Sequence, residues 1–175
     1  LILFKEMSFN LYHVQKFNLL DLFYNILIEN QSKINSKQIK VSFKEEDFRN
    51  IEIEGDRDKL KLAFFHIIDN AVKFSAKGGI ISLRVKNFND YIIIKMKDNG
   101  IGIKQGKIKH IFEAFYQGEL RSNRHYEGTG IGLSLVKKII TLHEGKIKIK
   151  SKESVGTIVY IKLFKQLNDI KVKHD

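Results

Sequence analysis

One predicted helix carries three side chains with binding chemistry. Apolar residues recur at helical spacing between residues 56 and 74, and His66, Asn70 and Lys73 follow at i, i+4 and i+7 on another face. An imidazole can serve as a base or a metal ligand, and the oxygen of an amide can serve as a metal ligand. An ammonium can neutralise phosphate charge. For this triplet alone, a solvated helix face is the simpler interpretation.

An aspartate and two glycines follow a predicted strand at residues 91–97. In the run Asp98-Asn99-Gly100-Ile101-Gly102, the carboxylate at the strand end can form a pocket floor and accept a hydrogen bond from an exocyclic amine such as that of adenine. The same residue types are common in turns, so this run alone is a weak signal.

A second glycine cluster, Gly128-Thr129-Gly130-Ile131-Gly132, opens directly onto a predicted helix at residues 133–143. Backbone N–H groups at a helix N-terminus bind phosphate. The cluster is not a Walker A loop, because no Gly-Lys-Ser/Thr follows. It also fits a Rossmann fingerprint poorly, because a long irregular segment precedes it.

The elements that must position these groups are helices and strands interleaved along the chain. We expect helices at residues 18–34, 56–74 and 133–143, and strands at residues 38–44, 51–54, 80–86, 91–97, 146–150 and 157–163. Short turns join several strands. This pattern favours an α+β fold, a two-layer sandwich, over a doubly wound parallel sheet.

The composition excludes several classes of protein. The 175 residues contain no cysteine, which excludes disulfide scaffolds and thiolate metal sites. No apolar run approaches the ~18–20 residues that span a bilayer. The net charge is +11, but 26 of the 31 basic residues are Lys and they are spread along the chain. Together with abundant Ile and Asn and the lack of Pro, this favours a coding-composition bias. A purposeful basic surface is the alternative, and we expect no nucleic-acid partner.

Taken together and in this order, the motifs are far more specific than each alone. The chain resembles the ATP-binding catalytic domain of sensor histidine kinases, within the superfamily shared with gyrase, Hsp90 and MutL. The resemblance rests on His66–Phe74 as asparagine box, Asp98–Ile103 and Gly128–Leu133 as glycine boxes, Phe112–Tyr116 as phenylalanine box and Gly156-Thr157 as a weaker last box. It implies a Bergerat-type fold, with a mixed sheet covered on one face by helices.

The resemblance also implies roles for single residues. Asn70 would bind Mg²⁺ and Lys73 would neutralise phosphate, with His66 beside them in the catalytic set. Asp98 would accept from the adenine amino group with support from Thr157, and Gly100 and Gly102 would let the backbone approach the nucleotide. The remaining expected nucleotide contacts are Ile103, Arg124, Gly128, Thr129, Gly130, Gly132 and Leu133.

Residues 104–127 would form the ATP lid, anchored to the core by Phe112 and Phe115. The segment is long, polar and rich in Lys, Arg and Gly, with few aliphatic residues to pack. We expect it to be mobile without nucleotide and partly ordered with it.

Two alternatives to a kinase remain open. An ATP-driven clamp of the gyrase, Hsp90 and MutL type needs a carboxylate base four residues before the metal ligand, and this chain has His66 there. A weakly binding pseudokinase is the other, because Gln117, Glu127 and Ser154 stand where the family often has Arg, Gly and Gly.

A kinase of this kind transfers the γ-phosphoryl of ATP to a histidine on a separate helical hairpin, and then on to a response regulator receiver domain. No histidine here has the expected sequence context, so we expect the phosphoacceptor to lie outside this chain. We expect residues 1–16 to be the end of that hairpin and a connector, residues 17–165 the catalytic domain and residues 166–175 a tail. The full protein would be a homodimer, this part of it a monomer, and the domain would be cytoplasmic.

Overall fold

A mixed five-stranded sheet forms one layer of the molecule. The computed structural model describes residues 13–116 and 129–167. The strand order is β2-β4-β5-β7-β6, with β2 parallel to β4 and the other neighbours antiparallel. The strands are β2 (Lys40–Phe43), β4 (Ile80–Asn87), β5 (Tyr91–Asp98), β6 (Lys146–Lys152) and β7 (Gly156–Phe164).

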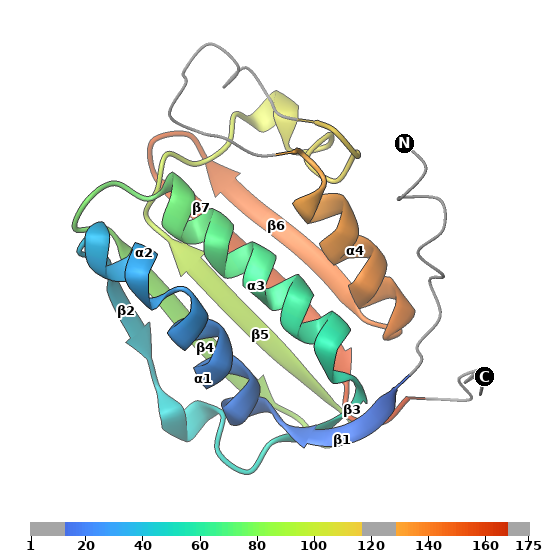
Figure 1. The fold of residues 1–175 in the computed structure, drawn as a ribbon. Coiled ribbons are helices and arrows are strands. Elements are labelled where there is room, and N and C mark those ends of the chain that lie inside the picture. The colour runs from blue at the N-terminus through green and yellow to red at the C-terminus, as the bar shows by residue number, and fades with distance from the viewer. Residues whose placement is uncertain (1–12, 117–128, 168–175) are drawn as a thin grey trace.

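Three helices, α1 (Leu19–Glu29), α3 (Arg57–Phe74) and α4 (Gly132–Leu142), cover one face of this sheet (Figure 1). Alternate strand residues such as Leu83, Ile94 and Ile161 are fully buried, because side chains on a strand point to opposite faces in turn. Within residues 13–116 and 129–167, no α-helix lies on the other face of the sheet (Figure 1). The expected α+β two-layer fold is therefore confirmed.

A small second sheet lies along the lower edge of the molecule in Figure 1. Strand β1 (Val14–Asn18) pairs antiparallel with β3 (Glu52–Asp56). The strand thus begins inside residues 1–16, for which we expected a helix end and a connector. Lys165, the last residue of the expected catalytic domain, also contacts β3, because its carbonyl accepts from Glu54 N at 2.8 Å.

The predicted helix at residues 18–34 is divided in two. Helix α1 ends at Glu29 and the short helix α2 (Gln31–Ser36) follows, with Asn30 between them. Asn30 is fully buried, and its Nδ2 donates to the Ile26 carbonyl at 2.9 Å. A side-chain amide that bonds the last turn competes with continued helix, and this is why the prediction of one helix was wrong.

Helix α3 begins where the sequence predicts. The Asp56 side chain accepts from Lys59 N at 3.1 Å, the hydrogen bond expected of an N-cap. Leu60, Phe64 and Ile67 are buried against the core. Within the described residues, no helix combines the length and hydropathy that crossing a bilayer requires.

Candidate functional site

A cavity of about 790 Å³ lies between α3, the ends of β5 and β7, and the start of α4. This size is typical of sites for small molecules. His66, Asn70 and Lys73 all line it, so the face of α3 that carries them is a cavity wall. The further expected site residues that line it are Asp98, Gly102, Ile103, Thr129, Gly130, Gly132, Leu133 and Thr157.

Three expected nucleotide contacts are not among the lining residues. Gly100 is buried against the end of α3, as described below. Arg124 and Gly128 lie outside the described residues, as does most of the second half of the expected lid.

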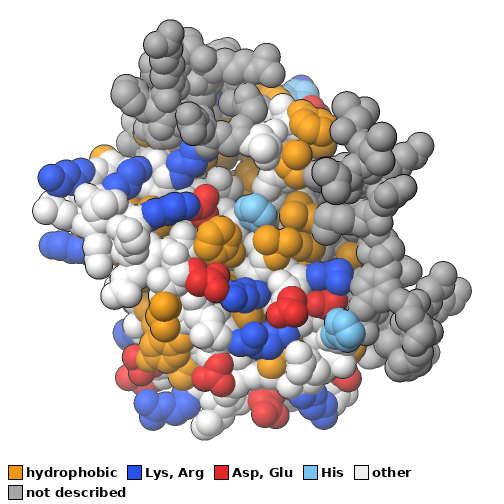
Figure 2. All heavy atoms as spheres, viewed as in Figure 1, with side chains coloured by type: hydrophobic (Ala, Val, Ile, Leu, Met, Phe, Trp, Pro, Cys, Tyr) orange, Lys and Arg blue, Asp and Glu red, His pale blue; other side chains and the backbone are white. Residues whose placement is uncertain are grey.

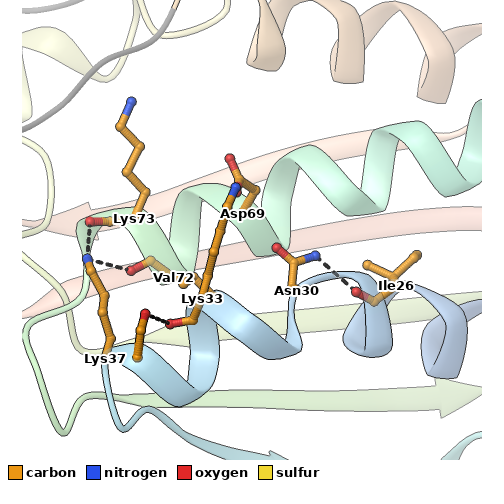
Figure 3. A network of polar contacts seen from close by, with 8 residues as sticks. Ile26, Asn30, Lys33, Lys37, Asp69, Val72 and Lys73 are labelled. Carbon is orange, nitrogen blue, oxygen red and sulfur yellow. Dashed lines mark hydrogen bonds and ion pairs between the residues drawn. The ribbon is translucent and has the colours of Figure 1, made fainter.

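The C-terminal end of α3 is fixed by a lysine from the segment after α2. Lys37 Nζ donates to the carbonyls of Val72 and Lys73 at 3.0 and 2.7 Å (Figure 3), and to the carbonyl of Ser75 at 3.1 Å. The last carbonyls of a helix lack partners within it, and a cation there also opposes the negative end of the helix dipole. Lys37 therefore holds the turn from which Lys73 extends.

A second lysine contacts the same helix one turn earlier. Lys33 Nζ forms an ion pair with Asp69 Oδ1 at 2.5 Å (Figure 3). Asp69 lines the cavity next to Asn70. No local motif marks either lysine, because both reach α3 across more than thirty residues of sequence.

Asp98 is held at the end of β5 by two backbone groups. Its Oδ1 accepts from Gly100 N at 2.9 Å and from Thr157 N at 3.2 Å. Among the described residues, Oδ2 accepts no hydrogen bond, so one carboxylate oxygen remains for a ligand. Burial raises the pKa of Asp98, and the two N–H groups partly oppose this by stabilising the charged form.

A serine outside the predicted motifs joins three parts of this corner. Ser151 Oγ on β6 accepts from Ile103 N at 2.9 Å and donates to the Gly156 carbonyl at 2.9 Å. It also lies 2.9 Å from Thr157 Oγ1. Ser151 therefore ties the first glycine cluster to the β6–β7 hairpin, and no local motif signals it.

The glycines of the first cluster are needed for contact with protein backbone. A Cβ at Gly100 would lie 2.5 Å from the Phe74 carbonyl oxygen, and one at Gly102 would lie 2.0 Å from that of Lys152. Gly102 also has a φ of +66°, which favours glycine. Protein backbone from the end of α3 and from the β6–β7 turn therefore approaches these glycines closely, and Gly102 also lines the cavity.

The second glycine cluster meets the asparagine box at the start of α4. Helix α4 begins at Gly132, where a Cβ would lie 3.3 Å from His66 Nδ1. Gly130 and Gly132 both line the cavity, so backbone of the helix N-terminus borders it. The predicted phosphate-binding backbone and the α3 side chains thus border the same cavity.

His66 is about half buried in this wall. Burial lowers its pKa, and Asp69 nearby acts in the opposite direction. The imidazole is therefore mainly neutral at pH 7 and can accept a proton.

The phenylalanine box is only partly as expected. Phe112 is partly buried, with Lys137 Nζ 5.5 Å from its ring centroid. Phe115 is 56% exposed, so the expectation that its ring anchors the lid in the core is wrong. The backbone makes the contact instead, because Phe115 N donates to the Gly130 carbonyl at 3.0 Å. Ile111 is the residue buried here, at 8% exposure.

The donor set limits how a metal ion can be bound. The described residues hold no group of three or more His, Cys, Asp and Glu side chains placed to bind one. A Mg²⁺ ion commonly takes one or two protein ligands and completes its shell with water and substrate phosphates. The Asn70 amide oxygen fits that pattern.

Comparisons with known proteins agree with this geometry. The family model described as "Histidine kinase-, DNA gyrase B-, and HSP90-like ATPase" matches residues 55–167. The methyl sulfide methyltransferase-associated sensor of Methanosarcina acetivorans is 34% identical over 87% of this chain and 15% of that protein. Sensor histidine kinase YclK of Bacillus subtilis is 32% identical over 83% of this chain and 30% of that protein. The chain thus spans less than a third of these curated relatives.

Solved structures show the same fold. The catalytic domain of histidine kinase ThkA matches with a TM-score of 0.75 and 24% identity, over 88% of this chain and 99% of that one. ThkA has also been solved in complex with the response regulator protein TrrA, and there the match covers 42% of the ThkA chain. On the family match, the fold and the composition of the cavity, this chain belongs to the histidine kinase-, DNA gyrase B- and HSP90-like ATPases and is a histidine kinase ATP-binding domain.

Proposed function

We propose that this domain binds Mg-ATP and donates its γ-phosphoryl group to a histidine on a separate helical domain of the same protein, for relay to a response regulator. The observation that carries the proposal is one cavity with a half-bonded carboxylate, Asp98, at one end and an amide and a cation, Asn70 and Lys73, on α3. The complex of ThkA with TrrA supports the same class of partner here. The whole protein would be a homodimer, with this domain in the cytoplasm.

The Asp98 end of the cavity suits adenine. Oδ2 can accept from the exocyclic amine, and Thr157, whose Oγ1 lies 2.9 Å from Ser151 Oγ, lines the cavity as a further polar residue. Met96, Ile103 and Val159 line the cavity nearby and offer apolar surface to the faces of a flat base. A few placed polar groups within apolar walls are the usual composition of such sites.

The sides of the cavity formed by α3 and by the start of α4 suit a triphosphate. Lys73 offers a cation, and the start of α4 offers backbone N–H groups and the positive end of its dipole. Asn70 would hold Mg²⁺ through its amide oxygen, and the bound ion would offset charge on the phosphate oxygens. The protein's own part in the transfer is therefore mainly to position and neutralise the phosphates.

His66 keeps ATP hydrolysis open as a second candidate function. It lines the cavity four residues before Asn70, and burial keeps its imidazole mainly neutral. A neutral imidazole near the phosphates could accept a proton from water. The kinase proposal expects slow hydrolysis without a phosphoacceptor, and a clamp ATPase expects turnover without one.

The direct test uses radiolabelled γ-phosphate ATP and the full-length protein that contains this domain. Label that becomes acid-labile on a histidine, and that then moves to a purified receiver domain, supports the proposal. Release of inorganic phosphate with no labelled protein would favour the clamp ATPase. Failure of a non-hydrolysable analogue to bind at millimolar concentration would favour the pseudokinase.

A further inference from the structure

The helix-free face of the five-stranded sheet is strongly basic. Residues that alternate with the buried core positions point to this face. We call it the lysine face and define it by Lys86 on β4, Lys95 on β5, Lys162 on β7 and Lys146, Lys148 and Lys150 on β6. Lys86 and the three lysines of β6 are exposed, and the other two are partly exposed.

Strand register places these lysines next to one another. Lys146 lies directly opposite Lys162 on neighbouring antiparallel strands. Like charges in opposed positions destabilise a sheet. The outward positions of β4, β5, β6 and β7 carry no acidic residue, and Asp98, the one acid within these strands, is buried on the other side. The lysines on this face therefore repel one another, and no acidic residue of these strands offsets the repulsion.

The opposite, helix-bearing face has a different charge pattern. Acidic and basic side chains are interspersed there (Figure 2), and several are paired, as Lys33 is with Asp69 and Lys61 with Glu29. A bias that simply raises the number of lysines would add them to both faces, but would not keep acids out of the outward positions of four neighbouring strands. One acid that reaches this side, Asp47, comes from outside these strands and pairs with Arg84 on β4 at 3.8 Å. The segregation therefore favours the purposeful basic surface over composition bias alone.

Aromatic side chains border the lysine face at one end. Phe88, in the turn between β4 and β5, is 40% exposed and stacks on Tyr91 with ring centroids 4.6 Å apart. Lys162 Nζ lies 3.9 Å from the Tyr91 ring centroid and 4.7 Å from that of Phe164. An exposed ring beside ammonium groups is suited to the boundary between lipid headgroups and acyl chains.

We propose that the lysine face binds the surface of an anionic lipid bilayer. A broad sheet of lysines matches a plane of negative headgroups. Nucleic acid fits less well, because Lys162 covers the Tyr91 and Phe164 rings that a single strand would use for stacking. The cavity is lined by residues of the helix-bearing side, among them His66 and Asn70. A bound bilayer would therefore leave it open.

Two double variants with the same change in charge test the proposal. Lys146→Glu/Lys148→Glu alters the lysine face on the exposed edge strand β6, and the change at position 146 places a carboxylate opposite Lys162, which relieves repulsion. Lys16→Glu/Lys77→Glu changes two exposed lysines outside that face. Thermal unfolding and binding of a non-hydrolysable ATP analogue confirm that each variant is folded.

Sedimentation of the whole chain with phosphatidylglycerol vesicles and with neutral phosphatidylcholine vesicles gives the readout. We expect binding to the anionic vesicles only, weakening with salt. Binding should fall at least about tenfold in the lysine-face variant and little in the control. A separate variant, Phe88→Ala, leaves the charge unchanged and should also bind the anionic vesicles more weakly than the unaltered chain.

Three results would overturn the proposal. The first is no binding of the unaltered chain to anionic vesicles. The second is an equal loss in both double variants, which would assign the effect to net charge. The third is tighter binding to a DNA or RNA oligonucleotide than to vesicles at equal phosphate concentration, which would identify a nucleic-acid surface instead.

Discussion

At the scale of single residues, Asp98 decides which base the cavity accepts. Oδ1 is committed to two backbone N–H groups, and Oδ2 is the acceptor left for a ligand. Guanine presents a carbonyl oxygen where adenine has its amine, so two acceptors would meet. An unmet buried acceptor costs about 1–3 kcal/mol, which predicts ATP binding tighter than GTP binding by roughly one to two decades.

Calorimetry with non-hydrolysable ATP and GTP analogues measures this preference. Asp98→Asn serves as the matched variant, because its amide can turn an N–H group toward the guanine carbonyl and should reduce the preference. Equal affinity of the unaltered domain for both nucleotides would remove Asp98 from the base-binding position.

Asn70 is predicted to couple nucleotide affinity to Mg²⁺. Asn70→Ala removes the amide oxygen and should make ATP affinity nearly independent of Mg²⁺, measured by calorimetry with and without the ion. Asn87→Ala, an exposed change at the end of β4, is the control and should keep the dependence of the unaltered domain. If Asn70→Ala keeps that dependence as well, another group binds the metal.

At the scale of elements, the end of α3 depends on Lys37. Lys37→Met leaves three carbonyls without their shared donor and should lower the free energy of unfolding by about 1–3 kcal/mol. ATP affinity should fall with it, because the same turn carries Lys73. Lys37→Arg keeps a cationic donor and should retain more of both. A Met variant that melts at the temperature of the unaltered domain and binds ATP equally well would show that the contact is incidental.

The lid makes a separate prediction at this scale. Residues 104–116 lie between the first glycine cluster and the expected tip, and Lys104, Lys107 and Tyr116 among them line the cavity. Hydrogen exchange of their amides should slow when Mg²⁺ and a non-hydrolysable ATP analogue are added, while β5 stays protected in both states. Equal exchange with and without nucleotide would mean that this segment does not respond to the ligand.

At the scale of the whole molecule, a buried histidine links distant elements and makes stability depend on pH. His143, at 1% exposure, accepts from Asp56 N at 3.0 Å and donates from Nδ1 to the Ile139 carbonyl at 2.8 Å. Burial lowers its pKa. Below about pH 6.5 the unfolded chain therefore binds a proton that the folded one does not, and stability must fall as the pH falls.

Urea unfolding at pH 5.5 and pH 7.5 measures that dependence. His143→Gln can keep both hydrogen bonds but cannot titrate, so the difference in stability between the two pH values should shrink. His13→Gln, a change at an exposed histidine, is the control. A His143→Gln protein with the full pH dependence would assign it to other groups, such as His66, whose pKa burial also lowers.

Local patterns in the sequence were enough to predict most elements and one wall of the cavity. Helix α3 with its cap at Asp56 follows from apolar periodicity and capping chemistry, which act within one or two turns. The same periodicity placed His66, Asn70 and Lys73 on one stripe, and the order of the glycine clusters indicated the family. These features depend on interactions between residues that are close in sequence, and such interactions can be inferred from the order of the residues.

Tertiary structure alone decided the features that depend on contacts between distant residues. Lys37 and Ser151 have no motif, and each acts on groups far away in sequence. The exposure of Phe115 depends on the backbone hydrogen bond between Phe115 and Gly130. The lysine face depends on strand order and register, which place Lys146 opposite Lys162. Residue types predict what a side chain can do, but which groups meet is set by how the layers pack.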